Sequence, residues 1–382
     1  MLHTFFRKRN TIFEYRYMYI YMIFSVFFFA FFTALFVIII DPYDYYPWGK
    51  KAKFTHNVYN PREMHLIING VLKSDFDTFY LGASTSAAFN VTDIINLFPE
   101  TKKAINASMV GGGYGELQYA MEKVSKAPNV RRVFVQLERF FWDFKRSNRI
   151  KGRYITDGLN TIDIRSVRLA FKMLINNKDA FDEFAVGDSL SYIDWNGRRQ
   201  STSYVKQLSI DVKENRKHLT SSFTRTCDDF PNILPLKDLA NKLEERKAEL
   251  IIVVPAYSRV LWFEMVNPHS MFYALGDRSI SIQDAKYRPF DDMLKMRYCV
   301  TKILDKHPNT KIFTFDRDDI YVGNYANFYD PAHFYNLSGF RSMLQDISSD
   351  KNRITLETFP EYEKEMRERT LNYQFLYEPK NE

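Results

Sequence analysis

The stretch Asp77-Thr-Phe-Tyr-Leu-Gly-Ala-Ser84-Thr-Ser-Ala87 decides the fold that the sequence predicts. Its apolar part, 78–81, has the length and composition of a buried strand. Gly82 permits a sharp turn after that strand, and residues 87–97 are compatible with a helix. Ser84 is then expected where the strand ends, beside free backbone N–H groups, which is where a nucleophile with an oxyanion site is needed. A Gly-x-Ser sequence also marks ordinary turns, so the rest of the chain has to decide.

The same pattern of strand, turn and helix recurs along the chain. Further strands are predicted at 103–108, 130–137, 250–254 and 311–315, and helices at 115–126, 236–247, 284–306 and 336–347. This alternation is typical of a parallel sheet covered by helices on both faces. We therefore expect a three-layer α/β/α domain over 75–349, with a central, mostly parallel five-stranded sheet of the flavodoxin-like kind.

The N-terminal region predicts a membrane anchor. No charged residue occurs from Tyr17 to Ile40. Tyrosines gather at the N-terminal end of this run, and tyrosines with Trp48 follow its C-terminal end. Such a run is long enough to cross a bilayer, and Asp41-Pro-Tyr-Asp does not resemble a signal-peptide cleavage site. Arg7, Lys8, Arg9 and Arg16 favour a cytoplasmic N-terminus (1–16) and an exported body. Residues 41–74 are expected to form a linker.

Two segments do not follow the alternating pattern. Residues 140–231 are interpreted as an insertion, in which 165–176 has the pattern of an amphipathic helix. Residues 350–382 are expected to be a charged tail, forming a solvated helix or strap. The insertion also contains Gly187-Asp-Ser189-Leu, an alternative nucleophile motif. Ser84 is preferred over Ser189 because only Ser84 has the strand–turn–helix context.

Composition excludes some classes of function. The formal net charge of +7 is modest, and no nucleic-acid recognition motif is found. The two cysteines, Cys227 and Cys299, lack the spacing of a zinc site, so neither a metal nor a cofactor is predicted. In an exported domain these cysteines could form a disulfide, and the sequence leaves this open.

A second candidate motif lies in the loop after the fifth predicted strand. It reads Tyr329-Asp330-Pro-Ala-His333, and His333 is the only one of the seven histidines with an aspartate three residues before it. Because the carboxyl ends of parallel strands meet in one crevice, this loop and Ser84 are expected to come together. Ser84, His333 and Asp330 would then be nucleophile, general base and orienting carboxylate.

These motifs, in this order, resemble those of the SGNH hydrolase superfamily. The likeness is to its membrane-anchored branch, related to alginate O-acetylation proteins and to the DltD proteins of teichoic acid D-alanylation. It covers roughly 75–347. It implies that Ser84, Asp330 and His333 are catalytic. It also implies that the block Asn106-Ala-Ser-Met-Val-Gly111 supplies an oxyanion glycine, Gly111 or Gly112, and that Asn106 itself contributes to oxyanion or substrate binding. A third block usually has an asparagine; this chain has Gln136-Leu-Glu138-Arg139, so Gln136 or Arg139 would have to replace that donor.

The resemblance implies a serine esterase or O-acyltransferase of a bacterial cytoplasmic membrane, acting outside the cytoplasm. Its substrate would be the acyl groups of a cell-envelope polysaccharide, and its partner a multi-pass membrane acyltransferase. The altered third block leaves open a second hypothesis. In that hypothesis the chain is a non-catalytic scaffold or glycan-binding subunit of a membrane acylation complex.

Overall fold

The structure is a computed structural model. It describes residues 2–40, 76–108, 113–138, 141, 167–168, 170–171, 174–175, 202–219, 225–267, 269–270 and 289–379. The chain divides into two compact units. One comprises Met1–Lys53 with Tyr154–Phe184, and the other comprises Phe54–Arg153 with Ala185–Glu382. The linker predicted at 41–74 and most of the predicted insertion lie outside the described residues.

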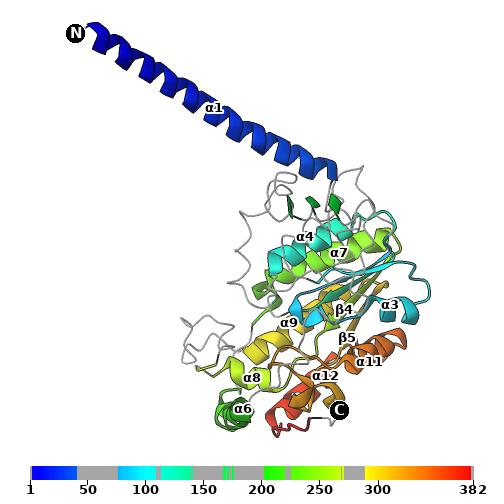
Figure 1. Ribbon diagram of the computed structural model, residues 1–382. Helices are drawn as coiled ribbons and strands as arrows, with labels where there is room; N and C mark the ends of the chain where they lie inside the picture. Colours follow the sequence, from blue (N-terminus) through cyan, green and yellow to red (C-terminus); the bar gives the residue numbers. More distant parts are fainter. Residues whose placement is uncertain are drawn as a thin grey trace. The chain divides into compact units, whose positions relative to one another are not determined.

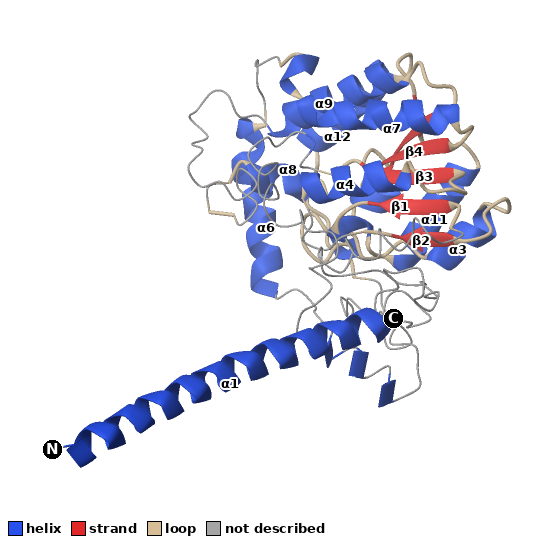
Figure 2. Ribbon diagram, turned by 90° about the horizontal axis from the view of Figure 1, so that it is seen from above, coloured by secondary structure: helices blue, strands red, loops and turns tan. Residues whose placement is uncertain are grey.

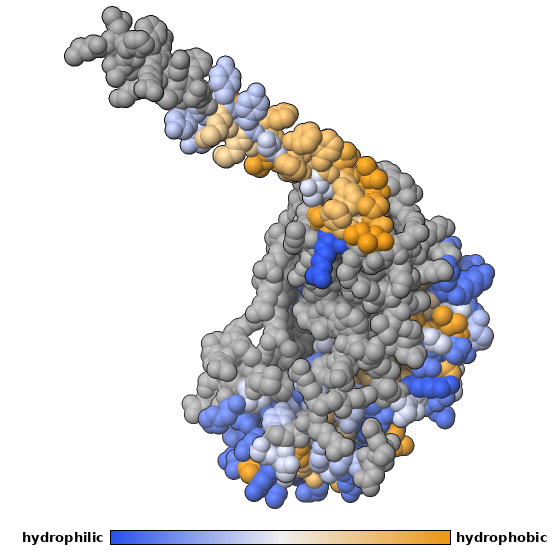
Figure 3. Space-filling model, viewed as in Figure 1, coloured by the Kyte–Doolittle hydropathy of each residue, from blue (hydrophilic) through white to orange (hydrophobic). Residues whose placement is uncertain are grey.

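The first unit contains one long helix, α1 (Leu2–Ile40). Within it, Tyr15–Ile40 is a 26-residue stretch long and apolar enough to cross a membrane. Apolar side chains gather along its C-terminal half in Figure 3, and most of them are exposed. Near its end Val37 is buried, and the Phe36 ring lies 4.9 Å from that of Phe171. The predicted helix over 17–40 is present.

The second unit is built on a mixed six-stranded sheet. Its strand order is β2-β1-β3-β4-β5-β6, and all neighbouring pairs are parallel except β5 and β6. The strands are β1 (Thr78–Leu81), β2 (Ala104–Asn106), β3 (Arg132–Gln136), β4 (Glu249–Val254), β5 (Thr310–Thr314) and β6 (Arg353–Ile354). The five predicted strands are the five parallel ones. The predicted total was one too low, because the sheet also has the short antiparallel edge strand β6.

Helices cover both faces of this sheet (Figure 1). On one face α3 (Val91–Leu97) packs against α11 (Leu337–Ser348), and on the other α4 (Tyr114–Val124) and α9 (Pro289–Leu304) pack against α7 (Leu234–Glu245). In α7 the buried residues form one apolar stripe, which comprises Leu236, Leu239, Ala240 and Leu243 at the spacing of one helix face. The other helices are α6 (Thr202–Asn215), α8 (Val260–Met265), α10 (Asp319–Val322) and α12 (Phe359–Leu371).

The strand order places one strand end at a special position. Strand β1 lies between β2 and β3, as Figure 2 shows from above. After β1 the chain forms β2 on one side of β1. It then crosses back and forms β3 on the other side of β1, and the later strands are added beyond β3. In open α/β sheets this switch of direction opens a crevice at the carboxyl ends of the strands. Ser84 comes three residues after the end of β1, at this crevice.

The C-terminal segment is not the solvated tail that the sequence predicted. It contributes β6 and α12, and α12 buries Phe359, Tyr362 and Met366. The Tyr362 hydroxyl donates to Asp316, which forms a fully buried ion pair with Arg297 of α9. A buried ion pair needs such additional partners for its remaining polar atoms. The many charged residues in the sequence of α12 made its buried face hard to predict.

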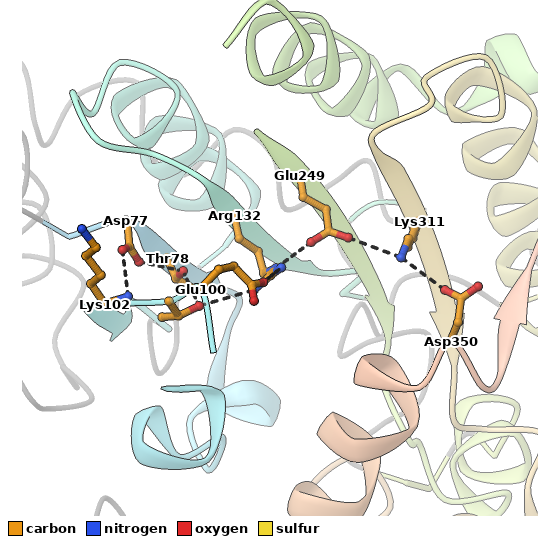
Figure 4. A network of polar contacts seen from close by, with 9 residues as sticks. Asp77, Thr78, Glu100, Lys102, Arg132, Glu249, Lys311 and Asp350 are labelled. Atoms are coloured by element: carbon orange, nitrogen blue, oxygen red, sulfur yellow. Dashed lines mark hydrogen bonds and ion pairs between the residues drawn. The ribbon is translucent and has the colours of Figure 1, made fainter. Parts of the chain in front are cut away.

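A polar network joins the opposite, amino-terminal ends of the strands (Figure 4). Arg132, at the start of β3, pairs with Glu249 at the start of β4 (2.6 Å) and with Glu100. Lys311 of β5 lies 3.5 Å from Glu249 and 3.4 Å from Asp350. This network connects neighbouring strands at the end of the sheet away from Ser84.

Cys227 and Cys299 form a disulfide, with their Cα atoms 5.4 Å apart. The question that the sequence left open is thus answered. Cys227 lies in a short helical turn, Cys227–Asp229, and Cys299 lies on α9. The bond closes a loop across a sequence separation of 72. Disulfides of this kind persist in oxidising compartments.

Candidate active site

The turn that carries Ser84 is a helical turn, Ser84–Ser86, entered directly from β1. Gly82 is required there by crowding, because a Cβ atom at this position would overlap the side chain of Ser86. The predicted helix over 87–97 starts later, at Val91, because the Asn90 side chain caps it by accepting from the Thr92 N–H (2.8 Å). Ser84 is therefore held on a short, tight turn and is half-buried.

The structure brings together the three residues that the sequence singled out. Ser84 Oγ lies 2.8 Å from His333 Nε2. His333 Nδ1 lies 2.8 Å from Asp330 Oδ2 and 2.9 Å from Oδ1. An ionised carboxylate can only accept, so the ring proton lies on Nδ1, and Nε2 is the acceptor for the Ser84 hydroxyl. The chain of hydrogen bonds runs from Ser84 through His333 to Asp330, the arrangement of a nucleophile, a base and an orienting group.

Local hydrogen bonds fix the loop that carries Asp330 and His333. Asp330 Oδ1 accepts the backbone N–H of Ala332 (2.8 Å) and of His333 (2.9 Å), which folds the loop into a tight turn. The Ser258 N–H, from the loop after β4, donates to the Pro331 carbonyl (3.2 Å). The motif Asp-x-x-His thus has a local cause, because the aspartate both shapes its loop and orients the ring.

Asp330 is held in its charged form. Burial alone would raise its pKa, but the hydrogen bonds from His333 and from the backbone of Ala332 outweigh that effect and keep the pKa below its ordinary value. A carboxylate in this position holds the imidazole ring in the tautomer and orientation in which Nε2 faces Ser84 Oγ.

Among the residues that the structure describes, the backbone N–H of Ser84 is a candidate for an oxyanion donor. In the part of the chain that the structure describes, this N–H has no hydrogen-bond partner, and it lies at the start of the turn Ser84–Ser86. Gly111 and Gly112, the predicted oxyanion glycines, lie outside the described residues. Gly113 is described, and its N–H donates to Glu116 Oε2 (3.0 Å) at the start of α4, so it is not such a donor.

Asn106 is not a substrate-binding residue, contrary to the prediction. It is fully buried, and its Nδ2 donates to the carbonyls of Ser86 (3.0 Å) and Phe89 (2.9 Å). Its Oδ1 accepts from the N–H (3.0 Å) and the hydroxyl (2.6 Å) of Ser108. All its polar capacity is used inside the protein. Asn106 ties the end of β2 to the nucleophile turn.

Gln136 also points inward and does not replace the oxyanion donor. Its Oε1 accepts from the Tyr80 hydroxyl (3.2 Å), and its Nε2 donates to Thr85 Oγ1 (2.6 Å) and to Glu138 Oε1 (3.2 Å). Only 1% of its surface is exposed. The other proposed replacement, Arg139, lies outside the described residues.

Sequence reasoning missed Glu138 as a functional candidate. Its side chain is buried next to the nucleophile turn, where it accepts hydrogen bonds from Ala83 and Thr85. A signal was present, because Glu138 is a charged residue directly after a buried apolar strand, at the end of the sheet where Ser84 was expected. It was interpreted only as the loss of a donor.

Among the described residues, no group of three or more His, Cys, Asp or Glu side chains could hold a metal ion. The Ser84 hydroxyl contacts the His333 imidazole, which in turn contacts the Asp330 carboxylate, and this arrangement suits acyl transfer through a serine.

No family model matches the chain, and no curated protein matches it. One solved structure that the chain matches is described as a proposed platelet activating factor from Streptococcus pneumonia. The similarity covers 76% of this chain and 91% of that one, with 9% sequence identity and a TM-score of 0.37. At this TM-score the likeness has no weight for function. The functional assignment rests on the geometry of the site.

Proposed function

We propose that this protein is a membrane-anchored serine esterase or O-acyltransferase. One observation carries the proposal, namely the continuous hydrogen-bond chain from Ser84 through His333 to Asp330. In the first half-reaction His333 Nε2 takes the Ser84 proton while Oγ attacks the carbonyl carbon of an acyl ester. The resulting oxyanion accepts the Ser84 N–H. The intermediate then expels the alcohol, which receives the proton from His333, and the acyl group stays on Ser84.

In the second half-reaction the acyl group leaves Ser84. Water or a sugar hydroxyl attacks the acyl carbon, and His333 removes its proton and returns a proton to Ser84 Oγ. Attack by water completes an ester hydrolysis, and attack by a sugar hydroxyl completes an O-acyl transfer. The exclusion of water by a bound acceptor favours transfer.

The cellular setting is proposed from two further features. The stretch Tyr15–Ile40 of α1 is long and apolar enough to anchor the chain, and the first 16 residues carry four basic side chains, Arg7, Lys8, Arg9 and Arg16. The Cys227–Cys299 disulfide fits an exported body. Together with the resemblance of the sequence motifs, these features support action on acyl groups of a cell-envelope polysaccharide, outside a bacterial cytoplasmic membrane. A multi-pass membrane acyltransferase is the proposed partner.

The intact hydrogen-bond chain disfavours the alternative of a non-catalytic scaffold, because a scaffold has no need of an ordered Ser-His-Asp relay. A fluorophosphonate probe separates the two, since it reacts with an activated serine. We expect the full-length protein in detergent to be labelled, Ser84→Ala to remain unlabelled, and Ser348→Ala, a change at an exposed serine of α11, to be labelled like the wild type. An unlabelled wild type that is folded would support the scaffold instead.

A further inference from the structure

Glu138 lies at the junction of three strand ends. It comes two residues after β3, with only 2% of its surface exposed. Its partners come from the loop after β1, from β3 itself and from the loop after β4. The hydrogen-bond chain from Ser84 through His333 to Asp330 does not include this carboxyl group, although the neighbouring His333 acts to lower its pKa. A buried carboxyl next to a nucleophile therefore needs an explanation of its own.

All the contacts of Glu138 are with donors inside the protein. Its Oε1 accepts the Ala83 N–H (3.1 Å), the Thr85 hydroxyl and the Gln136 amide (3.2 Å). Its Oε2 accepts the Tyr257 hydroxyl (3.0 Å). A developing oxyanion requires a hydrogen-bond donor, whereas this group accepts. Glu138 does not take over the role of the missing third-block asparagine.

Two of these contacts flank the nucleophile. Ala83 is the residue before Ser84 and Thr85 is the residue after it, and the same oxygen of Glu138 binds both. A clamp on both neighbours fixes the backbone of the turn and the direction in which Ser84 Oγ points. Tyr257 and Gln136 hold the carboxyl in place from the other strands.

We propose that Glu138 is a positioning residue, whose carboxyl group clamps Ala83 and Thr85 and so aims Ser84 at His333. This inference rests on the proposed function, because it assigns Glu138 a part in bringing the serine to its base. It also explains how the chain keeps a well-formed site although its third block differs from the superfamily pattern. In that block Glu138 holds the two neighbours of the nucleophile, Ala83 and Thr85.

Glutamine is the informative conservative replacement. In the described part of the chain no lysine or arginine binds Glu138. Burial raises its pKa, and the bonds from Thr85, Ala83 and Tyr257 together with the neighbouring His333 act in the opposite direction. Glu138→Gln keeps Oε1 as the acceptor for Ala83 and Thr85, and its amide can donate to the Tyr257 oxygen. Glu138→Ala removes the clamp entirely.

The experiment compares kcat, KM and the fluorophosphonate labelling rate of the full-length protein in detergent, with p-nitrophenyl acetate as substrate. We expect Glu138→Ala to lower kcat and the labelling rate about 100-fold, with KM changed by less than about threefold, since a displacement of about 1 Å has effects of this size. Glu138→Gln should stay within about tenfold of the wild type. The control Glu249→Ala, in the network at the far end of the sheet, should lower the melting temperature but leave kcat unchanged.

A second variant keeps the test decisive if Glu138→Ala does not fold. Thr85→Val preserves shape and removes one arm of the clamp, and we expect it to slow labelling about tenfold. A folded Glu138→Ala or, failing that, a folded Thr85→Val that labels at the wild-type rate overturns the inference. Glu138→Gln as slow as Glu138→Ala contradicts the clamp as well. A wild type that does not label is a different result, which contradicts the proposed function and this inference together.

Discussion

His333 Nε2 lies 2.8 Å from Ser84 Oγ, although 249 positions separate the two residues in the chain. Ser84 follows the first strand, and His333 follows the last parallel strand and precedes α11. The doubly wound sheet brings both to its carboxyl edge, where strand ends converge. Activity should therefore depend on the folded sheet and on both side chains.

The three members of the relay should differ in how much they matter. Ser84→Ala and His333→Ala should each abolish measurable probe labelling, because one removes the nucleophile and the other its base. Asp330→Asn should lower the labelling rate by roughly 10³-fold and leave a residue of activity, because a group that only orients and stabilises the base is less essential. Labelling rates of the three purified variants test this order. Equal loss in all three, with loss of circular dichroism, would indicate unfolding instead.

The lowered pKa of Asp330 predicts a pH-dependent contribution to stability. A carboxyl whose pKa is lower in the folded than in the unfolded protein stabilises the fold above its unfolded pKa, which is about 3.9 for aspartate. This contribution disappears as the pH falls through the folded pKa. The melting temperature of the wild type should exceed that of Asp330→Asn near pH 7, and the gap should shrink below about pH 4. A gap that widens on acidification would contradict the sign of the shift.

The disulfide should contribute substantially to stability. Closing a loop across a separation of 72 restricts the unfolded chain by about 4 kcal/mol in the chain-entropy account. We expect Cys227→Ser/Cys299→Ser to melt several degrees lower than the wild type, and reductant to lower the melting temperature of the wild type alone. Maleimide labelling of the denatured, unreduced wild type checks the bond directly. Two free thiols in protein isolated from the envelope would contradict the pairing.

The network at the amino ends of the strands should matter for stability but not for the chemistry. Arg132 binds Glu249 and Glu100, and its guanidinium lies over the Phe98 ring. Arg132→Met leaves Glu100 without its cation and leaves Glu249 with Lys311 alone, at a cost of about 1 kcal/mol or a melting temperature lowered by a few degrees. The labelling rate of the folded variant at low temperature should equal that of the wild type. A slower rate would mean that this end of the sheet affects Ser84.

The orientation of the chain is tested by fusions after Glu382. A reporter that is active only outside the cytoplasm should be active there, and a reporter that works only in the cytoplasm should be inactive. The basic residues Arg7, Lys8, Arg9 and Arg16, which precede the uncharged run 17–40 of α1, are the reason for this expectation. The reverse result would place the site among cytoplasmic substrates and remove the envelope polysaccharide from the proposal.

The parallel core of the fold could be predicted because its strands are short apolar runs between turns and amphipathic helices. The relay could be predicted because Asp330 orients its ring locally, through a motif three residues apart. The edge strand β6 could not be predicted, because Arg353–Ile354 is too short to show an alternation of apolar and polar residues. The buried Tyr362 lies within a charged sequence, and only contact with Arg297 and Asp316 reveals it.

The inward orientation of the Asn106 and Gln136 side chains could not be predicted from the sequence motifs. Asn106 and Gln136 lie near Ser84 in the sequence blocks and in space, yet their polar atoms all bind the protein. Whether a polar residue at a strand end faces a substrate or its own fold depends on partners from other strands. Tyr80, Thr85 and Ser86 are such partners, and their contacts exist only after the sheet has formed.

The most direct test of the central claim is to map the probe adduct by mass spectrometry. The full-length protein is treated with a fluorophosphonate, digested, and searched for the modified serine. The account predicts a single adduct on Ser84, which disappears in His333→Ala. An adduct on Ser189, the alternative nucleophile of the sequence, or on any other residue would contradict the assignment of Ser84 and His333 as nucleophile and base.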